Sequence, residues 1–169
     1  MFAYQRMVFW AASRGLRLRS VLTGKLGEGG MDHAVTMRGS YERISAGDVD
    51  GFGQLVAADF VEHQGGPGLP PTKEGTLEFF RKLLAAFPDM RMEVEDLIAS
   101  GDKTVARVQV VATHEGEFMG VAATGNRVEM ELIDIMRFDG AGRICEHWGV
   151  ADMLTLMQQI GAVPAGPPA

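Results

Sequence analysis

The chain has 169 residues, of which 46% are apolar and 22% are charged, a composition typical of one globular domain with its own core. Its single cysteine excludes an intramolecular disulfide, and no apolar run approaches the ~20 residues that cross a bilayer. We therefore expect a cytoplasmic protein that is not a membrane protein. Because the net charge is −6 and the residues after the first thirty offer no basic patch, we expect no nucleic-acid partner either.

The two ends of the chain differ in composition from its body. Residues 1–30 hold five Lys or Arg against one Glu, and glycines at 27, 29 and 30 close the segment. We expect this basic leader to lie outside the fold, with residues 31–161 forming a single domain; an amphipathic helix or a targeting segment is the alternative. Prolines at 164, 167 and 168 predict a frayed tail over residues 162–169.

Three helices are predicted before residue 90. Ala34–Ala46 has a helical pattern, and Asp48–Ala58 forms a second helix with its first residue as a cap. A short extended piece over 60–63 and a loop rich in glycine and proline over 65–71 follow. Thr72–Phe87 is the third helix, because apolar residues recur in it at every third or fourth position.

The second half of the chain is predicted to be a meander of long strands. These cover Met90–Ala99, Thr104–His114, Arg127–Phe138 and Arg143–Gly149, and a short helix then begins near Asp152, which is expected to be its N-cap. Helices followed by antiparallel strands indicate an α+β fold, in which a strongly curved sheet wraps the helices and encloses a pocket.

Asp134 lies in an otherwise apolar row of the third strand. Its neighbours on that row are Met130, Leu132, Met136 and Phe138. A carboxylate there loses part of its hydration, which is costly unless a hydrogen bond, a charge or a proton compensates. Asp134 is therefore a catalytic candidate, and an Asp held by backbone amides or an arginine for structural reasons is the alternative.

The loop at 139–142 decides which residue of the last strand lies beside Asp134. A three-residue loop, with Gly142 in the left-handed conformation, sets Asp134 opposite Trp148 and turns His147 to the other face. A two-residue loop sets Asp134 directly opposite His147, an acid/base pair. Gly142 favours the first register. A slip of one residue would move every side chain of the strand to the opposite face of the sheet.

Five further side chains are candidates for substrate binding. His63 would lie at the mouth of the pocket, Arg107 and Gln109 share one face of a central strand, His114 ends that strand, and Trp148 would shield the acid. Each also has a structural interpretation. His63 would be an exposed loop histidine, and Arg107 and Gln109 would lie on a solvated or dimer-facing side of the sheet. His114 would make a structural hydrogen bond, and Trp148 would pack in the fold. The four histidines lack metal-ligand spacing, so no metal site is expected.

An ordered set of short motifs resembles the SnoaL-like polyketide cyclases, or ester cyclases, of the nuclear-transport-factor-2-like superfamily. The motifs are Ala86-Phe87-Pro88-Asp89, Thr113-His114-Glu115-Gly116-Glu117-Phe118, Thr124-Gly125 and Glu146-His147-Trp148. The resemblance implies a cone-shaped domain that forms a homodimer, with an apolar cavity for a small carbonyl compound and no cofactor. It also implies ring closure by intramolecular aldol condensation, for which Asp134 and His147 are the candidate proton-transfer groups.

Two other functions remain open. Epoxide hydrolases of the same fold activate water with an Asp-Arg-Asp constellation, and here Gln109 stands beside Arg107 where that pattern requires a carboxylate. A non-catalytic ligand-binding or dimerisation module is the third possibility, because a fold does not dictate a function.

Overall fold

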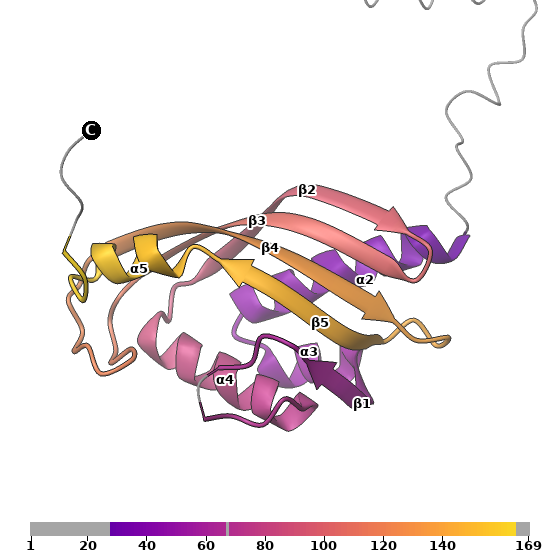
Figure 1. Ribbon diagram of the computed structural model, residues 1–169, viewed down its shortest axis with the longest axis horizontal. Coiled ribbons are helices and arrows are strands. Elements are labelled where there is room, and N and C mark those ends of the chain that lie inside the picture. Colours follow the sequence, from indigo (N-terminus) through magenta and orange to yellow (C-terminus); the bar gives the residue numbers. More distant parts are fainter. Residues whose placement is uncertain (1–27, 67, 165–169) are drawn as a thin grey trace, which may run out of the picture.

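The computed structural model describes residues 28–66 and 68–164, which contain four helices and a five-stranded sheet (Figure 1). The helices are α2 (Glu28–Ser45), α3 (Val49–Leu55), α4 (Lys73–Ala86) and α5 (Met153–Gln159). The strands are β1 (Val56–Glu62), β2 (Arg91–Ser100), β3 (Lys103–Thr113), β4 (Arg127–Phe138) and β5 (Ile144–Ala151).

The strands form one curved sheet in the order β1-β5-β4-β3-β2. Strands β2 to β5 are antiparallel neighbours. Helices α2, α3 and α4 lie together on one side of the sheet, while α5 lies beyond the end of β5 (Figure 1). The predicted α+β class is therefore confirmed.

Strand β1 corrects the predicted sheet in two ways. It pairs with β5 in parallel, so the sheet is mixed rather than wholly antiparallel. It also begins at Val56, inside the stretch 48–58 that was predicted as the second helix. The observed helix α3 ends at Leu55. Val56 and Ala57 are buried in the strand, and burial beside β5 outweighs the local helical pattern of these residues.

Capping residues begin three of the helices. The side chains of Asp48, Thr72 and Asp152 accept hydrogen bonds from backbone amides in the first turn of α3, α4 and α5. The predicted caps at Asp48 and Asp152 are thus confirmed. They fix the places where the chain turns from loop to helix.

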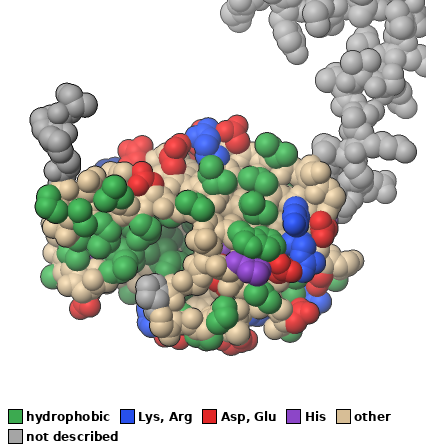
Figure 2. All heavy atoms as spheres, in the orientation of Figure 1, with side chains coloured by type: hydrophobic (Ala, Val, Ile, Leu, Met, Phe, Trp, Pro, Cys, Tyr) green, Lys and Arg blue, Asp and Glu red, His purple; other side chains and the backbone are tan. Residues whose placement is uncertain are grey.

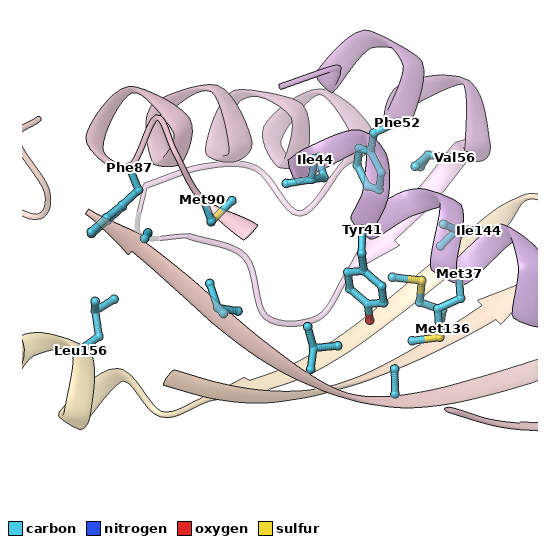
Figure 3. Packing of buried hydrophobic residues seen from close by; sticks show 14 of the residues in the cluster. Met37, Tyr41, Ile44, Phe52, Val56, Phe87, Met90, Met136, Ile144 and Leu156 are labelled. Carbon is cyan, nitrogen blue, oxygen red and sulfur yellow. The ribbon is translucent and has the colours of Figure 1, made fainter. Parts of the chain in front are cut away.

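The core lies between α2 and the inner face of the sheet. Met37, Tyr41 and Ile44 recur at helical spacing on α2 and are almost fully buried. They belong to one cluster with Val108 of β3 and Met136 of β4. Figure 3 shows the Tyr41 side chain extending from its helix toward the strands.

The predicted leader lies largely outside the described residues, which begin at 28; helix α2 already includes residues 28–30. Residues 165–169 of the predicted tail also lie outside them. Among the helices of the described part, none is long and apolar enough to cross a membrane.

Candidate active site

A cavity of about 470 Å³ lies between the sheet and the helices. Figure 2 shows a hollow on one face of the molecule, with hydrophobic side chains gathered around it. Apolar side chains dominate its wall; examples are Phe52, Phe60, Phe80, Met90, Met130 and Met136. No lysine or arginine is among the described residues that line it. The predicted apolar cavity is therefore present.

Asp134 projects from β4 into this cavity and is only 7% exposed. The Tyr41 hydroxyl donates a hydrogen bond to Asp134 Oδ2 at 2.9 Å. His147 Nε2 lies 3.1 Å from Asp134 Oδ1. Each carboxylate oxygen thus has one partner from a different element, which compensates for the water lost on burial.

The contact between Asp134 and His147 depends on a β-bulge. The loop has the predicted form: Gly142 has a φ of 75° and its amide donates to the Asp139 carbonyl. The ladder then shifts between Arg137 and Phe138, leaving Cys145 as an extra residue in β5. Because of this extra residue, His147 lies on the same face as Asp134.

The register inferred from the loop alone was therefore wrong. Asp134 pairs with Gly149 rather than with Trp148, and His147 pairs with Met136. The prediction that His147 points away from Asp134 fails for the same reason, because one extra residue exchanges the two faces of the strand. The loop geometry was right, and the bulge that follows it was missed.

Gly149 makes room for the pair. A Cβ atom built on Gly149 would lie 2.6 Å from Asp134 Oδ1 and 3.0 Å from His147 Cε1. Real Cβ atoms do not approach other atoms so closely. The close approach of carboxylate and imidazole therefore requires glycine at this position.

Glu62 completes a chain of polar groups along the cavity wall. It ends β1, where the parallel register pairs it with His147 of β5. The two carboxylate oxygens of Glu62 lie 2.8 and 2.9 Å from His147 Nδ1. The backbone amide of Gln64 donates a hydrogen bond to Glu62 Oε1 at 2.9 Å. The order of contacts is Tyr41, Asp134, His147, Glu62.

The two carboxylates change the pKa of His147, which lies between them, and Asp134 also changes the pKa of Tyr41. Although burial opposes charge on the imidazole, hydrogen bonds and negative charges from Asp134 and Glu62 raise the pKa of His147 to about 10. Burial, followed by the charge and hydrogen bond of Asp134, raises the pKa of Tyr41 above its usual value. His147 is accordingly a cation at neutral pH and donates from both ring nitrogens.

Two of the predicted substrate-binding residues, Arg107 and Gln109, lie on the outer face of the sheet. Arg107 forms ion pairs with Asp96 and Glu131, and the Gln109 amide donates to Glu129. They belong to the solvated or dimer-facing side that the sequence left as the alternative, because odd-numbered residues of β3 point away from the core.

His63 and Trp148 also lie outside the cavity. Their rings stack with centroids 4.5 Å apart, and His63 Nε2 is 3.2 Å from Glu146 Oε2. Neither residue lines the cavity. The bulge turns Trp148 outward when it turns His147 inward.

His114 is fully buried but does not line the cavity. Its Nδ1 is 3.0 Å from Thr124 Oγ1, and its ring packs against Phe87. These contacts correspond to the structural interpretation of this histidine.

Sequence reasoning missed Tyr41, Glu62 and Gly149. A phenol on the buried stripe of a helix needs a hydrogen-bond partner, and that signal was available for Tyr41. Glu62 precedes His63, which was predicted from the sequence as a binding residue. Only the pairing of β1 with β5 shows that Glu62, and not His63, lies in the cavity. Within the described residues no group of three or more His, Cys, Asp or Glu could hold a metal ion.

An apolar cavity with a few convergent polar groups, placed between a curved sheet and helices, is characteristic of small α+β domains that bind small molecules. The SnoaL-like polyketide cyclase model matches residues 34–160. The chain belongs to this family, as its motifs predicted.

Solved structures agree with this assignment. IdmH, a proposed polyketide cyclase from Streptomyces antibioticus, is 36% identical, with a TM-score of 0.67 over 76% of this chain and 98% of that one. AclR, a proposed hydroxylase from Streptomyces galilaeus, is 30% identical, with a TM-score of 0.74 over 82% and 86%. TsrD from Streptomyces laurentii is 26% identical, with a TM-score of 0.72 over 79% and 97%. No curated protein sequence matches the chain.

Proposed function

We propose that this protein is a cofactor-independent cyclase or isomerase that acts on a small, largely apolar carbonyl compound held in the cavity. The observation that carries the proposal is the contact between Asp134 and His147, a base and an acid placed 3.1 Å apart inside an apolar cavity. Membership of the polyketide cyclase family supports the same reaction class.

The reaction needs two proton transfers and one new carbon–carbon bond. The Asp134 carboxylate takes a proton from the carbon next to a carbonyl group, which leaves an enolate. The enolate carbon attacks a second carbonyl of the same molecule, and the resulting alkoxide takes a proton from His147 Nε2. Protonated Asp134 then returns its proton to His147, so the pair is restored without net gain or loss of protons.

The cavity suits this chemistry because it is apolar and its donors are already in place. Tyr41 and His147 hold the Asp134 carboxylate from two sides, so little rearrangement is needed as charge moves. Aromatic and methionine side chains around the pair would exclude water from the enolate.

Two alternatives make different demands on the site. An epoxide hydrolase of the Asp-Arg-Asp type needs an arginine in the cavity, and Arg107 is bound to carboxylates on the outer face. A hydroxylase is the second candidate because AclR is 30% identical. Its product would be heavier by one oxygen atom, whereas aldol ring closure leaves the mass unchanged.

The test uses a panel of apolar 1,5-diketones, which can close a six-membered ring by aldol addition. We expect wild-type protein to convert a member of the panel into an isomer, detected by chromatography with mass spectrometry. Asp134→Asn should abolish conversion, a loss of at least about 100-fold, with nearly unchanged melting temperature. Asp96→Asn, the same change on the outer face, is the matched control.

Equal turnover in Asp134→Asn would remove Asp134 from the mechanism. Ligand binding without turnover by the wild type would instead favour the non-catalytic module.

We also propose that the protein forms a homodimer through the outer face of the sheet. Ile98, Val105, Ile135 and Trp148 are paired in register from β2 to β5, which makes one apolar row across four strands. Ile98 is 67% exposed, and Ile133 beside the row is 50% exposed. Large exposed apolar side chains gathered on one face favour a protein partner.

A further inference from the structure

We propose that Glu62 is a positioning residue for this reaction: it holds the His147 imidazole with Nε2 turned toward Asp134 and keeps the ring charged for proton donation. The inference rests on the proposed function, and it assigns a role to a residue on the edge strand that neither the motifs nor the family match identifies.

The first support is geometric. Both oxygens of Glu62 lie within 2.9 Å of His147 Nδ1, and Glu62 is only 8% exposed. The Gln64 amide donates to the same carboxylate, which fixes its orientation. With Nδ1 bound in this way, the ring can present only Nε2 to Asp134. An imidazole without this partner could rotate about its last side-chain bond and lose the contact.

The second support comes from the arrangement of charges. The groups that face His147 are Asp134 of β4 and Glu62 of β1, while Tyr41 of α2 faces Asp134 from the other side. One carboxylate would give a neutral pair with the imidazolium. The second carboxylate adds a further negative charge in a site from which water is partly excluded, which favours the protonated ring.

The third support is that β1 brings Glu62 to this place by its pairing with β5. The carboxylate comes from a residue 85 positions away in the sequence. His63, the next residue, points to the outer face and contacts Glu146. At the end of β1, the Glu62 side chain therefore points into the cavity and the His63 side chain points to the outer face. Of the two, only Glu62 can act on His147.

The inference predicts a change in the titration of His147. In Glu62→Gln the amide keeps the size of the side chain, and its oxygen can still accept a hydrogen bond, but the charge is lost. We expect the pKa of His147 to fall from about 10 by about 1 to 3 pH units, the effect of one close charge. The decline of kcat/KM at high pH, where His147 loses its proton, should move down by the same amount.

The measurement is the pH titration of the imidazole nitrogens by NMR on the full-length protein. The chain has four histidines, so a His147→Gln sample assigns the signal. Glu146→Gln is the matched control, because it removes the same charge from the residue next to His147 but from the outer face. Glu62→Asp keeps the charge and should retain most of the raised pKa; circular dichroism confirms that each variant is folded.

An unchanged His147 titration in Glu62→Gln overturns the inference, and so does a shift of equal size in Glu146→Gln. If Glu62→Gln lowers the pKa of His147 but leaves the pH profile of kcat/KM unchanged, Glu62 has no role in the reaction. The titration needs no substrate, so it is separate from the test of function. If Asp134→Asn keeps full turnover while Glu62→Gln lowers the pKa of His147, the positioning of His147 stands and the proposed reaction fails.

Discussion

At the scale of single residues, the site is defined by what each side chain touches rather than by its chemical type. Among the residues that the structure describes, two acidic ones lie in the cavity wall, Glu62 and Asp134, and both contact the His147 imidazole. Histidines at 63 and 114 have the same ring, but one stacks on Trp148 and the other packs on Phe87. Burial between two carboxylates is what distinguishes His147 from the other described histidines and is why we propose it as the proton donor.

Gly149 gives a prediction at this scale. Gly149→Ala would place a methyl group 2.6 Å from Asp134 Oδ1 and 3.0 Å from His147 Cε1. We expect a loss of stability of about 1 to 3 kcal/mol from overpacking and a fall in kcat of about 100-fold, because the pair is forced apart. Urea denaturation and the diketone assay measure the two effects.

The matched control for this glycine is Gly140→Ala. Gly140 lies in the exposed loop with no atom within 4 Å of an added Cβ. A normal rate in Gly149→Ala would show that the site adapts and that the close approach is not required.

At the scale of elements, the bulge in β5 decides which face of the strand carries His147. Deleting Cys145 removes the extra residue while leaving the loop at 139–142 intact. We expect the strand then to pair without a bulge, with Arg137 still opposite Glu146 and Met136 still opposite His147, so that His147 keeps its place beside Asp134.

The measurements for this deletion are the titration of His147 and the diketone assay. Turnover and the raised pKa of His147 should both be retained, because His147 still pairs with Met136 and still faces Asp134. Cys145→Ala keeps the residue count and should keep both properties. Loss of the raised His147 pKa after the deletion would contradict this pairing and would mean that β5 slips by one residue against β4.

At the scale of the whole molecule, the sheet has two faces with different roles. The inner face carries the cavity and the polar chain, while the outer face carries the apolar row and the ion pairs of Arg107. A homodimer through the outer face would leave the cavity of each subunit accessible from the other side.

The dimer is tested with Ile133→Glu, which adds a charge beside the apolar row. We expect light scattering coupled to gel filtration to give a dimer for the wild type and a monomer for the variant, because an unpaired charge in an interface is costly. Glu129→Gln, on the same face but in a polar pair with Gln109, should remain a dimer. A monomeric wild type would end this proposal.

Much of the fold could be predicted from the sequence because the relevant signals are local. Apolar periodicity located the helices and the four long strands, Asp48 and Asp152 were recognised as caps, and Gly142 indicated the form of the loop. The alternation of apolar residues along 130–138 placed Asp134 on the inner face of the sheet. Each of these signals spans a few residues, so it depends little on the rest of the chain.

The composition of the site depended on contacts that no local pattern encodes. Tyr41 reaches Asp134 across 93 positions, and Glu62 reaches His147 across 85. Nothing near Val56 indicates that β1 joins β5 in parallel, and nothing in the loop indicates a bulge at Cys145.

The sequence by itself determined the class of fold, the family and one buried acid. Only the tertiary structure decided which imidazole meets that acid, because register is a property of paired strands and a single extra residue exchanges their faces.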